Sequence, residues 1–276
     1  MEEFAIPLAH IGDIAIEYER LGHAGHGRTP LLLINGIGGG RIQWPPQFLE
    51  LLAADFELIS FDNRGTGGSS KPARAWSMAD FADDTLGLID ALELRRVHLL
   101  GLSMGGMIAQ EVALRAPRRI DHLILADTHA GRKTAVPSAP WVEEAFAIDA
   151  ELSAQAQAEK SRPAVYSERF IARHSGWLDQ RLADTMAQHS PISTWVHHAA
   201  AIKSWDSFER LPRIKPPTLV LHGAEDVLIL PENGRVLATQ IPDARFELIE
   251  GSGHIPMAEQ PRKTVELIRN FLQDDA

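Results

Sequence analysis

Residues 97–116 read VHLLGLSMGGMIAQEVALRA, and this stretch decides the fold that we expect of the whole chain. Residues 97–100 are a short apolar run, which is typical of a strand buried on both faces. From residue 104 to residue 116 the apolar side chains recur with the spacing of one helix face. The pattern predicts a buried strand that turns sharply into a helix, with Ser103 at the turn.

The turn carries the pattern G-x-S-x-G, written here as Gly101-Leu102-Ser103-Met104-Gly105. In this pattern a serine between a strand and a helix presents its hydroxyl as a nucleophile. The backbone of so tight a turn is strained, and side chains two positions away would meet the neighbouring strand and helix, which glycine avoids. The pentapeptide alone is common, but its place between strand and helix is specific. We therefore predict that Ser103 is a nucleophile.

A serine hydroxyl is a weak nucleophile until a base takes its proton, so this interpretation requires a histidine and an acid that orients it. In enzymes with this serine turn the chain order is serine, then aspartate or glutamate, then histidine. Asp226 follows residues 217–222, which are typical of a buried strand, and so lies where ligand sites of open α/β sheets collect. His254 follows the alternating residues 245–250 on a glycine-rich loop. Ser103, Asp226 and His254 are the predicted triad.

Other histidines and acids compete for these roles. His129 follows a further predicted strand and is the alternative base. Asp127 is the second choice for the acid, and Glu225 is the third. Asp62 precedes the serine, and its neighbours indicate a structural turn held by side-chain hydrogen bonds. His222 ends a strand and is interpreted as a packing residue.

The charge that develops on a substrate carbonyl oxygen needs two backbone N–H groups, which form an oxyanion hole. The residue after the nucleophile, Met104, should supply one of them. The other should come from loop 35–40, which follows the predicted strand 31–34. Within this loop we choose Ile37, with Gly38 as the alternative.

Glycine-rich loops after strands also bind nucleotides, but the sequence lacks the corresponding patterns. G-x-G-x-x-G fails at its sixth position when it is counted from the glycines at 36, 65 or 251. No Gly-Lys pair occurs anywhere in the chain, which excludes a Walker A loop. We expect no nucleotide and no other cofactor.

Three motifs together resemble the α/β-hydrolase superfamily, and the resemblance extends over essentially the whole chain. They are the turn at 62–65 (DNRG), the serine turn at 101–106 and the Gly253-His254 loop. Within the superfamily they are most similar to bacterial esterases and 3-oxoadipate enol-lactonase-type enzymes. The resemblance implies a core sheet of eight mostly parallel strands with flanking helices and a helical cap inserted after strand six. Many relatives carry His-Gly in the oxyanion loop, whereas this chain has Asn35-Gly36, whose asparagine can still brace the loop.

The composition changes near residue 130, where a proline-containing connector leads into a segment without strand-like runs. We expect residues 130–210 to form a helical cap, and residues 1–129 and 211–276 to form the α/β core. Functional insertions commonly lie at loops near the active edge of a sheet. We therefore expect the cap to set substrate choice, while the core supplies the chemistry.

Proline marks two expected helix starts. Ser190 before Pro191 predicts an N-cap for a helix of the cap, which includes the adjacent histidines at 197 and 198. Pro256 opens a helix that we expect to run from about residue 257 to residue 272.

Aromatic residues are the main candidates for contact with substrate. Gln43 and Trp44 follow the oxyanion loop, and with His129 they are the core residues that we expect near the substrate. Four of the six tryptophans lie in the cap, at positions 141, 177, 195 and 205. They either line an apolar pocket or form the cap's own core.

Several function classes are excluded by what the sequence lacks. The chain has 276 residues and no cysteine, so it has no disulfide, no thiol nucleophile and no Cys-ligated zinc. No H-E-x-x-H pattern occurs, and we expect no metal. The formal net charge of −10 disfavours nucleic acid and anionic membranes as partners. An acidic start and the lack of a long apolar run predict a cytoplasmic protein.

The sequence therefore predicts a cofactor-independent serine hydrolase for a small ester or lactone with a partly apolar portion. Two different functions stay open. The same triad can cleave a carbon–carbon bond or catalyse perhydrolysis, and some members of the fold bind ligands without catalysis.

Overall fold

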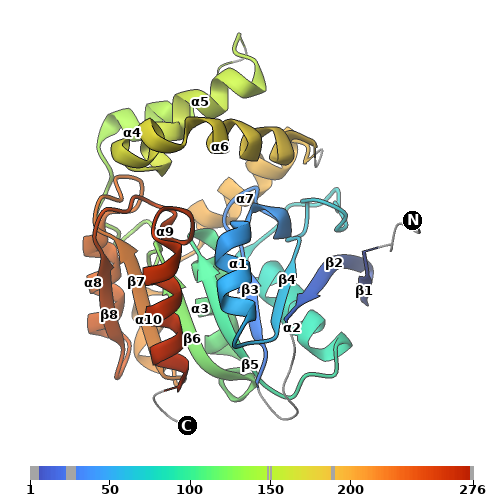
Figure 1. Ribbon diagram of the computed structural model, residues 1–276. Helices are drawn as coiled ribbons and strands as arrows, with labels where there is room; N and C mark the ends of the chain where they lie inside the picture. Colours follow the sequence, from blue (N-terminus) through green and yellow to red (C-terminus); the bar gives the residue numbers. More distant parts are fainter. Residues whose placement is uncertain (1–5, 23–28, 148, 150, 188–189, 274–276) are drawn as a thin grey trace.

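A computed structural model of the chain, shown in Figure 1, describes residues 6–22, 29–147, 149, 151–187 and 190–273. Within these residues eight strands form one sheet in the spatial order β1-β2-β4-β3-β5-β6-β7-β8. The strands are β1 (Leu8–Ile11), β2 (Ile14–Leu21), β3 (Leu31–Ile34), β4 (Leu58–Phe61), β5 (Val97–Leu102), β6 (Ile120–Ala126), β7 (Thr218–Gly223) and β8 (Arg245–Ile249). β2 pairs antiparallel with β1 and β4, and every other pair is parallel. The eight-stranded, mostly parallel sheet that the sequence predicts is confirmed.

Helices cover both faces of this sheet (Figure 1). Those that flank it are α1 (Pro46–Ala53), α2 (Met78–Ala91), α3 (Met104–Arg115), α8 (Pro231–Gln240), α9 (Pro256–Glu259) and α10 (Pro261–Gln273). Short 3₁₀ helices occur at η1 (Arg41–Gln43), η2 (Pro117–Arg119) and η3 (Phe208–Arg213). The α-helices connect the parallel strands. Consecutive parallel strands start at the same edge of the sheet, so the chain must cross back over one face between them.

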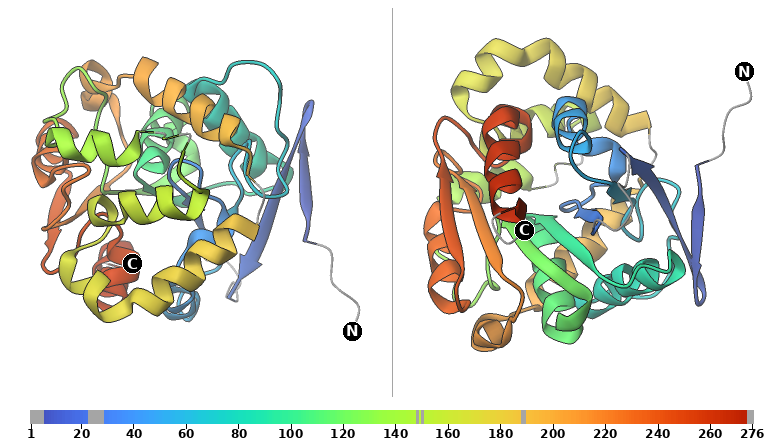
Figure 2. Two further views of the ribbon diagram at one scale, coloured as in Figure 1. Left: turned by 90° about the horizontal axis from the view of Figure 1, so that it is seen from above. Right: turned by 60° about the horizontal axis from the view of Figure 1, so that its bottom comes forward.

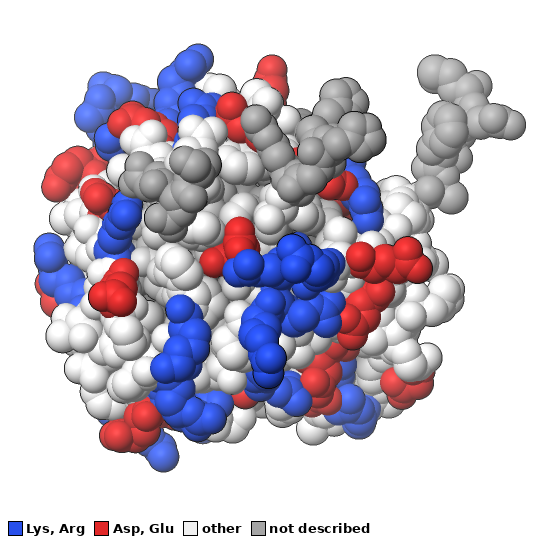
Figure 3. Space-filling view, turned by 90° about the horizontal axis from the view of Figure 1, so that it is seen from below, with Lys and Arg blue, Asp and Glu red and all other residues white. Residues whose placement is uncertain are grey.

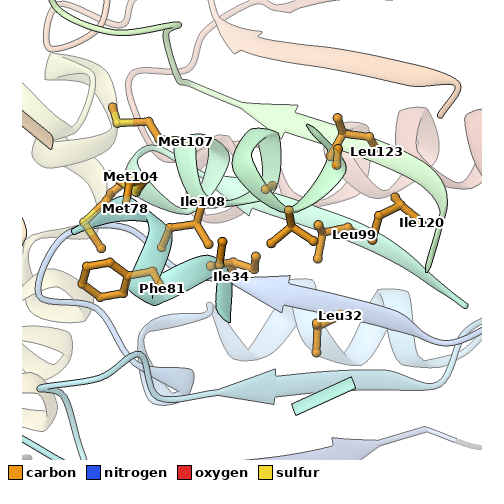
Figure 4. Packing of buried hydrophobic residues seen from close by; sticks show 14 of the residues in the cluster. Leu32, Ile34, Met78, Phe81, Leu99, Met104, Met107, Ile108, Ile120 and Leu123 are labelled. Carbon is orange, nitrogen blue, oxygen red and sulfur yellow. The ribbon is translucent and has the colours of Figure 1, made fainter. Parts of the chain in front are cut away.

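The two faces of the sheet bury separate hydrophobic clusters. Along β3, Leu32 and Ile34 pack with residues of α2 and α3, whereas Leu31 and Leu33 pack with residues of α1 and α10. Successive side chains of a strand point to opposite faces, so a strand covered on both sides must be apolar throughout. Figure 4 shows the first cluster, in which Ile108 of α3 lies beside Ile34. This packing fixes the position of α3, and with it the turn at the end of β5.

Four α-helices of the described part of the chain are inserted between β6 and β7. They are α4 (Pro140–Phe146), α5 (Ala154–Val165), α6 (Glu168–Ala187) and α7 (Ile192–Ser204). Figure 1 and the left view of Figure 2 show α4, α5 and α6 lying across the top of the sheet, over the edge where the parallel strands end. Val142, Ala145 and Ala164 of this insertion form a small buried cluster against Val227 and Leu228 of the core.

Two helix boundaries differ from the prediction. The single helix expected from residue 257 to 272 is two helices, because Pro261 begins α10 and Gln260 before it leaves the helical conformation (φ −134°, ψ 54°). Ser190 is not the N-cap of α7, since Pro191 occupies that position in an extended conformation.

Charge and hydropathy of the described residues add two facts. No described helix is long and apolar enough to cross a membrane. On the face opposite the inserted helices, Lys and Arg side chains lie beside Asp and Glu side chains (Figure 3). Both signs of charge are therefore interspersed there.

Candidate active site

Ser103 lies between β5 and α3, at the turn that the sequence predicts. Its backbone has φ 57° and ψ −119°, a left-handed conformation that non-glycine residues rarely adopt. A Cβ at Gly101 would collide with the carbonyl of Gly105, and one at Gly105 would collide with the carbonyl of Ile34. The two glycines therefore allow strand, turn and helix to approach closely, which leaves the Ser103 side chain facing a cavity.

His254 and Asp226 form a buried pair at the same edge. The Nδ1 of His254 lies 2.8 Å from Oδ2 of Asp226, and Oδ1 of Asp226 accepts the N–H groups of Leu228 (2.9 Å) and Ile229 (3.0 Å). Burial alone would raise the pKa of Asp226, but His254 and His222 beside it outweigh this and lower the pKa to about 2. Because a carboxylate only accepts, Nδ1 of His254 carries the proton, and Nε2 is left free to act as a base.

The loop that carries His254 is held by the inserted segment as well as by the core. The backbone N–H of His254 donates to the carbonyl of Val165, at the end of α5 (2.9 Å). The carboxylate of Glu259 accepts from the N–H of Gly253 (2.9 Å) and from the N–H (3.0 Å) and hydroxyl (2.5 Å) of Ser167. The position of the imidazole therefore depends on both parts of the chain.

His222 is a residue whose place at the site the sequence analysis missed. Its Nε2 donates to the carbonyl of Ile229 (2.7 Å) and lies 3.4 Å from Oδ2 of Asp226. It therefore braces the loop around Asp226 instead of only filling space. Its position four residues before the predicted acid, at the end of a strand, was the available signal.

The alternative acid, Asp127, is fully buried behind Asp226. Its Oδ1 accepts the N–H of Gly223 (2.8 Å), and its backbone has a left-handed φ of 47°. Burial, and the charge of Asp226 next to it, raise the pKa of Asp127 well above its usual range. Its surroundings therefore disfavour the charged form of Asp127, and the acid hydrogen-bonded to His254 is Asp226.

His129 and Glu225, the remaining candidates for the base and the acid, lie apart from the cavity. His129 accepts the N–H of Gly131 through Nδ1 (3.0 Å), and burial lowers its pKa to about 4. It is not among the described residues that line the cavity, where we expected it. Glu225 is exposed.

Among the described residues, two groups of side chains have spacings that a metal ion could bridge. Asp127, His222 and Asp226 are one group, in which Oδ1 of Asp127, Nε2 of His222 and both oxygens of Asp226 take part in the contacts above. His98, Asp121 and His122 are the other, at the opposite edge of the sheet, where Asp121 pairs with Arg96 at 2.5 Å. Neither group faces the cavity of Ser103.

The loop after β3 lies against Ser103. Asn35 braces it as expected, because its Oδ1 accepts the N–H of Gly36 (2.7 Å) and its Nδ2 donates to the carbonyl of Gly40 (3.0 Å). The N–H of Gly38, the alternative oxyanion donor, is engaged by Nδ1 of His198 (3.1 Å).

The two N–H groups chosen from the sequence remain available. Neither Ile37 nor Met104 donates its backbone N–H to an acceptor among the described residues. Ile37 also lines the cavity beside Ser103. Two unengaged N–H groups next to a serine are what an oxyanion hole requires.

A cavity of about 270 Å³ connects these groups with the inserted helices. Ser103 and His254 lie at its base, together with Gln43 and Trp44, which were expected near the substrate. Half of the other lining residues come from α5, α6 and α7, and most of these are apolar or aromatic, although Arg162 and Arg181 also line the cavity.

The four tryptophans of the inserted segment divide evenly. Trp177 and Trp195 line the cavity. Trp141 is 45% exposed on the surface, and Trp205 is buried with its Nε1 donating to Glu111 (3.0 Å). The interpretation that they line a pocket therefore holds for two of the four, whereas Trp205 belongs to the hydrophobic cluster of the α/β core and Trp141 lies at the surface.

Comparison with known proteins identifies the family. A family described by the α/β hydrolase fold matches residues 29–261. The chain belongs to the α/β-hydrolase fold family. A candidate carbamate hydrolase, RutD of Azorhizobium caulinodans, is 31% identical over 96% of this chain and 98% of its own length. A poly(3-hydroxyalkanoate) depolymerase of Ectopseudomonas oleovorans is 33% identical over 90% and 85%.

Among solved structures, the enol-lactonase of Burkholderia xenovorans LB400 has a TM-score of 0.82 at 27% identity. The match covers 96% of this chain and 99% of that protein. Family and relatives together identify the chain as a hydrolase, which confirms the fold and the broad class that the sequence predicts.

Proposed function

We propose that this hydrolase cleaves a carboxylic ester or lactone through an acyl-enzyme on Ser103, without a cofactor. The observation that carries the proposal is that Ser103 and His254 line one cavity, while His254 is hydrogen-bonded to a buried Asp226. These are the positions and roles of a nucleophile, a base and an orienting acid.

In the proposed reaction, Oγ of Ser103 attacks the carbonyl carbon and its proton moves to Nε2 of His254. The oxyanion accepts hydrogen bonds from the N–H groups of Ile37 and Met104. Collapse of the tetrahedral intermediate breaks the ester bond, and the leaving alkoxide oxygen takes the proton from His254. A water molecule then releases the acid by the same steps, with His254 again as the base.

The cavity supports a small substrate with an apolar portion. Its volume, about 270 Å³, and its aromatic lining by Trp44, Trp177 and Trp195 fit such a group. Two of the relatives are named for ester-linked compounds, an enol-lactone and a poly(3-hydroxyalkanoate). The third, RutD, is named for carbamates, whose carbonyl carbon carries one nitrogen and one oxygen where an ester carbonyl carries one carbon and one oxygen.

A fluorophosphonate probe and a substrate panel test the proposal. The probe should label wild type at Ser103 and leave Ser103→Ala unlabelled. Ser103→Ala should lower kcat on the best substrate by roughly 10⁴–10⁶, with the fold intact by circular dichroism. A variant that retains more than about a tenth of the wild-type kcat would contradict the assignment of the nucleophile.

The panel should contain p-nitrophenyl esters, lactones, carbamates and a 1,3-diketone. We expect the highest kcat/KM on an ester or a lactone. A preference for the carbamates or for carbon–carbon cleavage would keep the triad and replace the substrate class. A lack of turnover on every compound, together with a lack of labelling, would favour a binding protein that has kept the fold.

A further inference from the structure

His198, on α7 of the inserted segment, makes two hydrogen bonds to loops of the core. Its Nδ1 lies 3.1 Å from the backbone nitrogen of Gly38, and its Nε2 lies 3.0 Å from the carbonyl oxygen of Arg64. The Arg64 carbonyl can only accept, so Nε2 carries the proton of the ring. Nδ1 is then the acceptor for the Gly38 N–H. The two contacts therefore require one tautomer of a neutral imidazole.

The surroundings of His198 keep it in this state. The ring is fully buried, and Trp76 and Phe81 pack against it with centroids at 5.6 and 5.0 Å. Burial lowers the pKa of His198 to about 4, so the ring is neutral in the physiological range. Arg64, in turn, is fixed by paired hydrogen bonds to Asp84 at 2.5 and 2.6 Å.

Other residues of α7 contact the same two loops. The hydroxyl of Thr194 donates to the carbonyl of Gly65 (2.8 Å). The ring of Trp195 lies directly against Gly38, so closely that a Cβ at that glycine would collide with it. Trp195 also lines the cavity. One helix of the insertion therefore touches the substrate cavity and the loop behind the oxyanion donor.

We propose that His198 is a positioning residue for the oxyanion hole: by accepting the N–H of Gly38 it holds the loop so that the N–H of Ile37, one residue earlier, faces the substrate. The proposal rests on the function proposed above. Without the imidazole, Gly38 would have a buried N–H lacking an acceptor, and the peptide units on either side of it could rotate. Such rotation would move the Ile37 N–H, which donates to the transition state more strongly than to the substrate.

The effect should therefore fall on kcat and not on KM. Complete loss of one oxyanion donor lowers kcat by roughly 10²–10³. For His198→Leu, which removes the acceptor and keeps an apolar side chain, we expect a fall of about 10- to 100-fold with KM nearly unchanged. The affinity for a boronic acid, whose adduct on Ser103 places an oxygen in the oxyanion hole, should fall by the same factor.

Two matched variants separate positioning from packing. His198→Asn keeps a side-chain oxygen near the position of Nδ1, so it should restore most of the kcat and of the boronate affinity. His197→Leu changes the neighbouring histidine, whose ring packs against Trp76 with centroids 4.5 Å apart, and should leave both quantities near wild type. If His198→Leu behaves like His197→Leu, or if His198→Asn is as impaired as His198→Leu, the proposal is wrong.

A measurement on wild type keeps the test independent of whether His198→Leu folds. In ¹⁵N-histidine-labelled protein at pH 6, the imidazole signal that disappears in His198→Asn should report a neutral ring with its proton on Nε2. A charged ring or an Nδ1–H tautomer would overturn the proposal. Failure of the proposed function itself looks different, because wild type would then lack turnover that depends on Ser103.

Discussion

At the scale of single residues, two neighbouring buried carboxyl groups, those of Asp226 and Asp127, have pKa values shifted in opposite directions. Asp226 faces His254 and accepts three hydrogen bonds, which keeps it ionised. Asp127 lies behind it and accepts the N–H of Gly223, and burial beside Asp226 favours its protonated form. A second negative charge beside Asp226 is costly in a buried place, so the surroundings favour ionisation of Asp226 over that of Asp127.

This division of roles predicts different effects for the same substitution. Asp226→Asn should lower kcat by roughly 10³–10⁴, because His254 loses the acceptor that fixes its tautomer. Asp127→Asn should lower kcat far less, since the acid hydrogen-bonded to His254 is Asp226 and the amide has nearly the same shape as the acid. Steady-state kinetics on the best ester would check both. If the two effects were reversed, the orienting acid would be the residue after β6.

The serine turn makes a second prediction at this scale. Gly105→Ala would drive a methyl group into the carbonyl of Ile34 and should destabilise the protein by about 1–3 kcal/mol, as overpacking does. Gly176→Ala is the control, because an added Cβ there meets nothing within 4 Å. Gly176 is exposed on α6, so alanine there should stabilise the protein by about 0.5–1 kcal/mol. Urea denaturation of both variants would measure the difference, and equal effects would contradict this account of the turn.

At the scale of elements, the sequence predicted the helices and strands whose bounds follow from the spacing of their apolar residues. The strand before Ser103 and the helix after it lie within two residues of their predicted bounds, because each is buried against the sheet or within it. The break between α9 and α10 at Gln260 was not predicted. Pro261 lies inside a helical pattern of apolar residues, and this pattern hid the tendency of a proline to keep the preceding residue out of the helical conformation.

Only those site residues could be predicted that follow directly from a local sequence pattern. Ser103, Asp226 and His254 each follow a strand, and the topology of a parallel sheet brings such positions together. His198 acts on Gly38, which lies 160 positions before it in the sequence, and a pattern along one helix carries no information about such a contact. His222 lies only four residues before Asp226, but its hydrogen bond to the carbonyl of Ile229 depends on how the intervening loop folds.

The inserted helices allow a prediction about specificity. Trp177 and Trp195 line the cavity, so Trp→Ala at either position should change the preference among acyl chains by roughly tenfold or more. Trp141→Ala is the matched control, because that side chain lies on the surface, and it should leave the profile unchanged. Relative kcat/KM values for acetyl to octanoyl p-nitrophenyl esters would measure this. An unchanged profile in both cavity variants would place the acyl group elsewhere.

At the scale of the whole molecule, the insertion and the core build the site together. We expected the segment from 130 to 210 to set substrate choice and the core to supply the chemistry. The contacts of the segment do not support this division of roles. The N–H of Gly38 donates to His198, and the N–H of His254 donates to Val165. Removing the segment would therefore disturb loop 35–40 and the position of His254 as well as the cavity.

The pH dependence of stability is a second property of the whole molecule. Buried histidines and a buried aspartate contribute to it with opposite signs. Burial lowers the pKa of His98, His129 and His198 to about 4 each, against about 6.5 in an unfolded chain. Between these values only the unfolded chain takes up the proton, so each histidine makes stability fall as the pH falls. Burial also raises the pKa of Asp62 to about 6, which has the opposite effect, because the folded chain takes up that proton first.

The contribution of one group can be isolated at His98, which lies at the start of β5, far from Ser103. His98→Asn removes a group that only the unfolded chain protonates between about pH 6.5 and pH 4. The slope of the unfolding free energy against pH should therefore decrease by up to about 1.4 kcal/mol per pH unit in that window. Val97→Ala, a buried non-titrating neighbour, should lower stability by a constant amount and leave the slope unchanged. Urea denaturation at half-unit steps from pH 7 to pH 4 would measure both curves. If the curve of His98→Asn ran parallel to that of wild type, His98 would already be charged in the folded protein, and burial would not control its protonation.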